Sequence, residues 1–274
     1  MALSLERPLV LVGAGKMGSA LLQGWLAKGL LPSLVDVRDP APSPDIEALT
    51  ARGLSLNAPV EEIAVKGPAL VLLAVKPQSM AAVLPELSLL VSPHTVFLSI
   101  AAGTALHRLQ DLLGPQAHVI RAMPNTPASI GRGITVACAN SLVTAEQKAM
   151  ADELLAAVGE VGWGESEALI DAVTAVSGSG PAYVFYMVEC LAAAGEALGL
   201  EASLAMKLAR ETVSGAGEML NRTDEPASSL RANVTSPGGT TAAALDVLMG
   251  EGGLSPLMRR AALAARDRAR ELGK

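Results

Sequence analysis

The sequence predicts an α/β protein, with an N-terminal Rossmann domain built on a doubly wound parallel sheet and a C-terminal all-helical domain. Three observations predict this fold class. A G-x-G-x-x-G run follows a short apolar segment near the N-terminus. Further apolar runs alternate with helical or turn-rich segments through the first half. Beyond residue 167 the apolar residues keep helical spacing. We therefore divide the chain into domains at 1–164 and 165–274.

The composition is that of a globular protein without a nucleic-acid partner. Of the 274 residues, 50% are hydrophobic and 18% are charged, which excludes a disordered chain. With two Trp, two Tyr and two Phe there is no aromatic platform for bases, and the net charge of -6 would repel a polyanion. Cys138 and Cys190 lie far apart, so we expect both to be buried, unpaired thiols in a reducing compartment.

The sequence also argues against a metal site and against a membrane partner. His94, His107 and His118 do not have metal-ligand spacing. Residues 1–8 have no apolar signal-peptide core, and no window approaches the roughly 20 apolar residues that a spanning helix needs. We expect a soluble, cytoplasmic protein.

The first motif is typical of a nicotinamide dinucleotide site. The apolar run 9–12 precedes the glycines, and a helical pattern follows them, which is the order that this fingerprint requires. Gly13 would make the tight turn, Gly15 would admit the pyrophosphate, and Gly18 would let the helix pack on its strand. The predicted contacts are Gly13, Ala14, Gly15, Lys16, Met17 and Gly18.

The next apolar run, 34–37, ends in a pair of residues that gives two conflicting signals. An acid here accepts from the ribose 2′-hydroxyl and favours NAD(H), whereas an arginine accommodates the 2′-phosphate of NADP(H). Asp39 gives the first signal and Arg38 the second. A third interpretation is that Asp39 only begins a turn at Pro40. The sequence therefore predicts NADP(H) or NAD(H) without choosing between them.

Further strands are predicted at 69–75, 95–100, 119–122 and 134–137. Ligands of parallel sheets lie at the carboxyl ends of the strands. The segments that leave three of these ends, 74–78, 99–103 and 121–127, are therefore candidates for the wall beside the nicotinamide. Lys76 could instead be a solvated charge, and Asn125 a turn residue.

The C-terminal region contains a second candidate site at 234–241, Val-Thr-Ser-Pro-Gly-Gly-Thr-Thr. A Pro-Gly-Gly turn lets a ligand approach the backbone, and a helix that opens at Thr240 or Thr241 would offer free N–H groups to an anion such as a carboxylate. The alternative is that Ser236 or Thr240 is only a helix N-cap.

The helices around this site should pack very closely. Alanine and glycine recur at 192–195 and 214–217, breaks are predicted at 177–181 and 223–226, and several helices are apolar on more than one side. Such helices need partners, and we expect the partner to be a second copy of the chain, which makes this the dimerisation domain.

Taken together, five motifs resemble those of the Δ1-pyrroline-5-carboxylate reductase family. They are found at 13–18, 74–78, 121–128, 177–183 and 234–241, in the family's order, and the resemblance covers nearly the whole chain. It implies a Rossmann domain, an interlocking helical dimer, and reduction of the cyclic imine pyrroline-5-carboxylate to proline by NAD(P)H, the last step of proline biosynthesis.

The resemblance also implies roles for individual residues. It adds cofactor contacts at Ala74, Val75, Lys76, Pro77, Ile100, Ala101, Ala102 and Asn233. It implies substrate contacts at Glu167, Thr240 and Thr241. The anion site predicted above adds Ser236, Gly238 and Gly239 to the substrate contacts. This sequence departs from the family at Asp39, where members that prefer NADPH often carry a small hydroxyl residue, and at Ala232, where some relatives carry an acid.

The chemistry of an imine fits a site without histidine or lysine. A cyclic imine can be protonated before it reacts, so its carbon needs no strong acid beside it. We expect Gly238 to Thr241 to hold the carboxylate and Thr241 to hydrogen-bond the ring nitrogen, as the catalytic residue.

Two other functions remain open. A reductase of keto acids would need a cationic proton donor, and the one interior lysine after Lys148 is Lys207, in an ordinary amphipathic helix. A dinucleotide-binding scaffold protein would have no reason to keep an anion site at 236–241.

Overall fold

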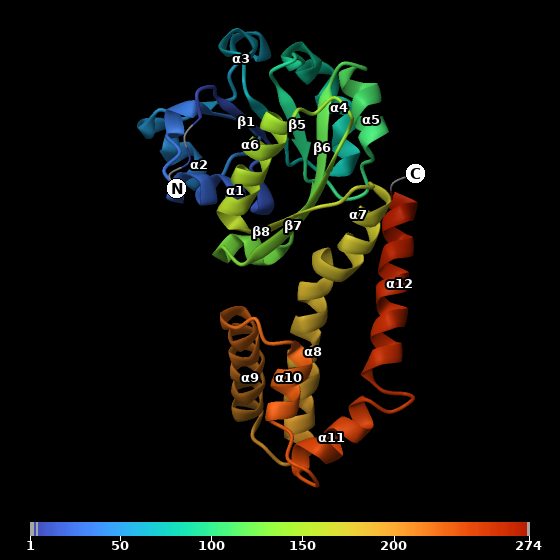
Figure 1. The fold of residues 1–274 in the computed structure, drawn as a ribbon. Helices are drawn as coiled ribbons and strands as arrows, with labels where there is room; N and C mark the ends of the chain where they lie inside the picture. The colour runs from blue at the N-terminus through green and yellow to red at the C-terminus, as the bar shows by residue number, and fades with distance from the viewer. Residues whose placement is uncertain (1–2, 4, 273–274) are drawn as a thin grey trace. The chain divides into compact units, whose positions relative to one another are not determined.

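The computed structural model describes residue 3 and residues 5–272. The chain forms two compact units (Figure 1): unit one contains residues up to Gly178 together with those from Arg266 onward, and unit two is Ser179–Ala265. Unit one is thus built from both ends of the chain, because helix α7 (Ala168–Val173) and the last turns of helix α12 (Leu254–Leu272) belong to it. The functional division between residues 164 and 165 stays a prediction.

Unit one is organised around an eight-stranded sheet, with the order β3-β2-β1-β4-β5-β6-β7-β8 among the described residues. The strands are β1 (Leu9–Val12), β2 (Val35–Arg38), β3 (Ser55–Leu56), β4 (Leu70–Leu73), β5 (Val96–Ser99), β6 (His118–Met123), β7 (Gly133–Ala139) and β8 (Gly159–Trp163). The doubly wound sheet is confirmed, and the sequence analysis missed the short β3 and the edge strand β8.

One pair of strands corrects the expectation of a wholly parallel sheet, because β7 runs antiparallel to β6. The connection between them holds only a short 3-10 helix, Thr126–Ile130. A parallel neighbour requires a crossover of a dozen or more residues, usually through a helix. The short connection therefore turns the chain back on itself.

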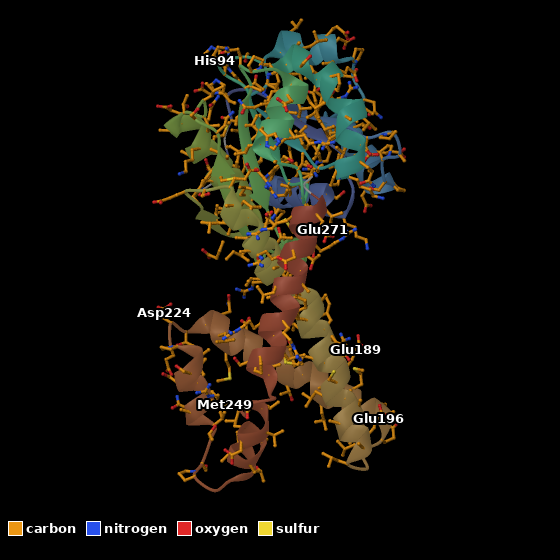
Figure 2. All side chains as sticks on the ribbon, turned by 90° about the vertical axis from the view of Figure 1, so that its right-hand side faces the viewer. His94, Glu189, Glu196, Asp224, Met249 and Glu271 are labelled. Atoms are coloured by element: carbon orange, nitrogen blue, oxygen red, sulfur yellow. The ribbon has the colours of Figure 1, made fainter. Side chains whose placement is uncertain are left out.

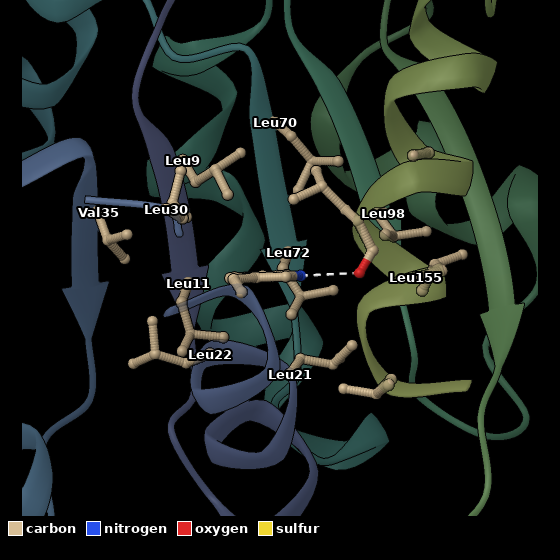
Figure 3. Packing of buried hydrophobic residues seen from close by; sticks show 14 of the residues in the cluster. Leu9, Leu11, Leu21, Leu22, Leu30, Val35, Leu70, Leu72, Leu98 and Leu155 are labelled. Atoms are coloured by element: carbon tan, nitrogen blue, oxygen red, sulfur yellow. Dashed lines mark hydrogen bonds between the residues drawn. The ribbon is translucent and has the colours of Figure 1, made fainter. Parts of the chain in front are cut away.

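The central strands are apolar because helices cover both faces of the sheet. Each of β1, β4 and β5 is buried along its whole length, as expected for parallel strands with two covered faces. One apolar cluster includes residues of α1 (Lys16–Ala27) and α6 (Ala145–Leu155), and the other includes residues of α3 (Val60–Lys66), α4 (Met80–Leu87) and α5 (Leu106–Leu113). Figure 3 shows the first cluster, in which Trp25 Nε1 donates to the Leu154 carbonyl at 2.9 Å. The short helix α2 (Pro44–Ala48) follows β2.

The described residues of unit two contain helices and no strand, as predicted. The helices are α8 (Gly180–Ala197), α9 (Ala202–Arg222), α10 (Ala227–Asn233), α11 (Thr240–Leu248) and the first part of α12. A π-helical turn, Thr174–Gly178, and a bend at Ser179 precede α8, so the predicted break is confirmed. Helix α9 ends directly before the predicted break at 223–226.

The glycines of α8 and α9 differ in how closely other residues pack against them. A Cβ built on Gly195 would lie 3.1 Å from the Ala205 Cβ, so the predicted close approach of the two helices is confirmed there. A Cβ on Gly215 or Gly217 would meet no described atom within 4 Å. This part of α9 is therefore uncovered in the single chain.

Large apolar side chains are exposed along α8 and α9. The charged side chains of Glu189 and Glu196 also lie on α8 (Figure 2). The exposed apolar residues of these helices are Val184, Phe185, Tyr186, Met187, Leu191, Leu204, Met206, Leu208, Met219 and Leu220. Cys138 is buried, but Cys190 on α8 is exposed, which corrects the expectation that both thiols are buried. Among the described helices, none combines the length and the hydropathy that a bilayer span requires.

Candidate dinucleotide and substrate sites

The glycine loop between β1 and α1 has the shape of a phosphate cradle. Gly13 has φ +92°, and a Cβ there would lie 2.9 Å from the Ala74 backbone. A Cβ on Gly18 would collide with the Gly13 carbonyl oxygen. A Cβ on Gly15, by contrast, would meet no described atom within 4 Å, and Gly15 is the N-cap of α1 with no side-chain cap. The loop therefore leaves open space beside uncapped helix N–H groups, which fits a pyrophosphate.

Asp39 lies against this loop. Its Oδ2 accepts from the Ala14 N–H at 2.6 Å, and its Oδ1 accepts from the Ala41 N–H at 2.8 Å. The second bond shows that Asp39 also forms the turn considered above. Asn57, which has φ +55°, holds the Asp39 backbone: the Asp39 N–H donates to Asn57 Oδ1 at 2.9 Å, and Asn57 Nδ2 donates to the Asp39 carbonyl at 2.8 Å. Asp39 is therefore fixed beside the loop at the end of β2.

Arg38 has partners of its own. Its Nη1 donates to the Ala58 carbonyl at 2.8 Å, and its Nη2 donates to both carboxylate oxygens of Glu86 at 3.0 Å. The sequence analysis missed Asn57 and Glu86. Asn57 tolerates a left-handed backbone and sits in a turn, which is a weak signal. Glu86 gives no local signal, because it is 48 residues from Arg38.

The predicted wall residues leave two adjacent strands. Ala74 to Pro77 follow β4, and Ile100 to Ala102 follow β5, which pairs with β4. Strand β4 also pairs with β1, whose end carries the glycine loop. The structure thus brings the predicted Rossmann contacts to one edge of the sheet. Lys76 is exposed there. Asn125, in contrast, is 9% exposed and accepts from the Ile134 N–H at 2.9 Å, so it holds the start of β7.

An ion-pair network surrounds the buried Arg121 of β6, and the sequence analysis missed it. Arg121 is 5% exposed, and its guanidinium donates to Glu167 at 2.8 Å and to Asp171 at 3.3 Å. Glu167 also accepts from the Leu106 N–H at the start of α5, at 2.8 Å. The structure therefore ties the predicted substrate residue Glu167 into unit one. The one signal available was a cation among the apolar residues of the predicted strand 119–122.

Cys138 is the register partner of Arg121 across β6 and β7. Burial raises the pKa of the Cys138 thiol to about 11, and the negative charge of Glu167 acts in the same direction. The thiol is therefore protonated at neutral pH, as expected for a buried cysteine in the sheet.

The predicted anion site lies in unit two, at the start of α11. Gly238 has φ +69°, which favours glycine, and the Gly239 N–H donates to the Ser236 carbonyl at 3.0 Å. Helix α11 opens at Thr240, and its N-cap is Gly239, with no side-chain cap. The interpretation of Ser236 or Thr240 as an N-cap is therefore wrong. Ser236 and Thr240 are exposed, and Thr241 is half-buried.

Asn233 ends α10 in the same unit. Its Nδ2 donates to Glu225 at 3.4 Å. The predicted residues thus form two sets: the glycine loop, Asp39, the strand-end residues and Glu167 lie in unit one, and Asn233 and 236–241 lie in unit two.

These features define a Rossmann-type, dinucleotide-dependent oxidoreductase with a helical second region, and comparisons with known proteins specify it further. Residues 8–103 match the family model "NADP oxidoreductase coenzyme F420-dependent", and residues 167–272 match "Pyrroline-5-carboxylate reductase dimerisation". The chain is 38% identical to the pyrroline-5-carboxylate reductase of Pseudomonas aeruginosa, over 97% of both chains. It is also 38% identical to that of Arabidopsis thaliana, over 96% of this chain and 94% of the other.

Solved structures of pyrroline-5-carboxylate reductases are also similar to this chain. A pyrroline-5-carboxylate reductase from Coxiella burnetii superposes with a TM-score of 0.90 at 35% identity, covering 98% of this chain and 100% of the other. The Plasmodium falciparum enzyme, solved with NADP bound, gives 0.82 at 29% identity, covering 98% and 99%. The chain belongs to the pyrroline-5-carboxylate reductase family.

Proposed function

We propose that this protein reduces 1-pyrroline-5-carboxylate to L-proline with NAD(P)H. The observation that carries the proposal is the uncapped start of α11 behind the Gly238–Gly239 turn, in a chain of this family. A helix start without a side-chain cap offers N–H donors and the positive end of the helix dipole to a carboxylate. When bound, the reduced nicotinamide supplies the hydride that the imine carbon accepts.

The residues of 236–241 bind and orient the substrate. The backbone N–H groups of Gly238, Thr240 and Thr241 and the exposed hydroxyls of Ser236 and Thr240 hold the carboxylate, while the Gly239 N–H closes the turn on the Ser236 carbonyl. The protonated ring nitrogen donates to Thr241 Oγ1, which fixes the ring and stabilises its charge. Because the imine carbon is already electrophilic, positioning accounts for most of the catalysis.

The Rossmann residues hold the dinucleotide. Gly13 to Gly18 bind the pyrophosphate, Arg38 and Asp39 face the adenosine ribose, and Ala74 to Pro77 and Ile100 to Ala102 flank the nicotinamide. Asn233 adds a cofactor contact. Glu167, which pairs with Arg121 of β6, contacts the substrate. The protein works as a homodimer or a larger homo-oligomer, in the reducing cytoplasm, without a nucleic-acid partner.

The test is the Thr241→Ala variant, with Thr241→Ser as the matched control that keeps the hydroxyl. Loss of one oriented hydrogen-bond partner should lower kcat with pyrroline-5-carboxylate by roughly 10- to 1000-fold. Thr241→Ser should recover most of the rate. Near wild-type turnover by Thr241→Ala would remove this residue from the mechanism.

A substrate panel tests the reaction itself. NAD(P)H oxidation should depend on pyrroline-5-carboxylate and should be slow with keto acids. Preferential turnover of a keto acid would overturn the substrate assignment, and dinucleotide binding without oxidation by any substrate would indicate a scaffold protein.

A further inference from the structure

We propose that this protein binds NADH in preference to NADPH, and that Asp39 and Glu86 together set the preference. The inference rests on the proposed function only in requiring that a nicotinamide dinucleotide occupies the glycine loop. It concerns the adenosine end of the cofactor, far from the reacting atoms.

The first step is the position of the Asp39 carboxylate. In this fold the adenosine ribose lies between the glycine loop and the end of the second strand. The 2.6 Å hydrogen bond from the Ala14 N–H places Oδ2 of Asp39 at that location. Each carboxylate oxygen accepts one backbone N–H and keeps a further acceptor site, so the pair can still receive ribose hydroxyls.

The second step is that this carboxylate cannot easily turn away. The Ala14 and Ala41 N–H groups hold its two oxygens, and Asn57 holds its backbone with two hydrogen bonds. A 2′-phosphate, which carries roughly -1.5 to -2 charges at neutral pH, would have to enter beside a fixed negative charge. Rotation of Asp39 to relieve the repulsion would give up the bond to the glycine loop.

The third step concerns Arg38, the cation that could neutralise the phosphate. Its two terminal nitrogens already donate to Ala58 and Glu86. The Glu86 side chain is 53% exposed, and an exposed ion pair contributes little, so Arg38 could leave it at small cost. Glu86 would nevertheless remain nearby as a second carboxylate. The single positive charge of Arg38 would then face the negative charges of two carboxylates and of the 2′-phosphate.

Lys16, a second cation in this region, does not discriminate between the two dinucleotides. Lys16 is exposed within the glycine loop, where the pyrophosphate binds. Both dinucleotides carry the same pyrophosphate, so a contact with Lys16 stabilises them equally. The balance of charge at the ribose end therefore decides the preference.

The experiment measures the Kd of NADH and of NADPH by nicotinamide fluorescence, without substrate, so that it reports binding rather than turnover. We expect wild type to bind NADH at least about tenfold more tightly, because like charges brought together at a binding site are strongly unfavourable. Asp39→Ser should remove most of that ratio. Glu86→Gln should move the ratio toward NADPH several-fold, because it frees Arg38 and removes a charge.

Asp45→Ser is the matched control: it removes an exposed acid from α2, in the same unit, and should leave the ratio unchanged. Glu86→Gln changes an exposed side chain, so it keeps the test decisive if Asp39→Ser fails to fold. Equal or tighter binding of NADPH by wild type would overturn the inference, and an unchanged ratio in both variants would overturn the roles of Asp39 and Glu86. If the ratio holds but pyrroline-5-carboxylate is not reduced, the proposed substrate fails and this inference stands.

Discussion

Gly15 and Gly18 stand in the same loop, yet their surroundings differ. The space at Gly15 is open, whereas a Cβ at Gly18 would strike the Gly13 carbonyl. We expect Gly18→Ala to lower the free energy of unfolding by about 1–3 kcal/mol, as overpacking does. Gly15→Ala should cost about 1 kcal/mol at most, through the weaker N-cap, and should mainly weaken dinucleotide binding. Urea unfolding and fluorescence titration separate the two, and equal stabilities would contradict the contact at Gly18.

Cys138 gives a prediction for alkaline pH. Burial raises the pKa of this thiol to about 11, from 9.0 for an unperturbed thiol, so the folded state keeps a proton that the unfolded state releases. The stabilisation from this group is therefore complete below about pH 9 and is lost as the pH rises toward about 11. Urea unfolding from pH 8 to pH 11 should show a steeper loss of stability in wild type than in Cys138→Ala. The same loss of stability with pH in both proteins would contradict the raised pKa of Cys138.

Residues whose roles depend on nearby sequence were predictable, and residues whose roles depend on distant packing were not. The glycines and Asp39 follow from the strand-turn-helix order, because the local backbone requires them. The partners of Arg38 and Arg121 lie about 20 to 50 residues away in sequence, and only the folded chain selects them.

At the scale of elements, the Arg121 network links β6, α5 and α7. Glu167→Gln combined with Asp171→Asn would leave the Arg121 guanidinium buried without a counter-charge. We expect this double variant to lower the free energy of unfolding by about 3–5 kcal/mol. Adding Arg121→Met should restore part of the loss, because the uncompensated charge is then removed. Urea unfolding of the double and triple variants tests this, and a triple variant less stable than the double would refute it.

The sheet shows which features of elements a sequence conveys. Fully buried strands such as β1 and β4 were evident as unbroken apolar runs. Strand β8 lies at the edge of the sheet and contains two glycines and a glutamate, so it lacks that pattern. The direction of β7 depends on the length of a connection, which apolar periodicity does not report.

At the scale of the whole molecule, the uncovered apolar residues of α8 and α9 need a partner. The match of 167–272 to a dimerisation family supports a second copy of the chain. Phe185 is 63% exposed on α8, and we expect Phe185→Glu to shift the protein toward monomer and to lower the Tm at low protein concentration. Light scattering after gel filtration measures this.

Val65→Glu is the control for that experiment, because Val65 is 90% exposed in unit one and is also apolar. It should leave both the molar mass and the Tm unchanged. An unaltered oligomer in Phe185→Glu would place the interface elsewhere on unit two.

The two-part plan of the molecule was predictable from the change of apolar spacing, but its division by contacts was not. Helix α7 looks like part of the helical region in the sequence, but in the structure it packs against β6 and β7, where Asp171 and Glu167 pair with Arg121.

The closing residues of α12 also belong to unit one, where Leu272 lies against Gly103 and Arg270 is 3.7 Å from Asp171. During synthesis the ribosome delivers all of unit two before these residues emerge. The nascent N-terminal unit therefore lacks the contacts of Arg270 with Asp171 and of Leu272 with Gly103 until the last turns of α12 have been translated.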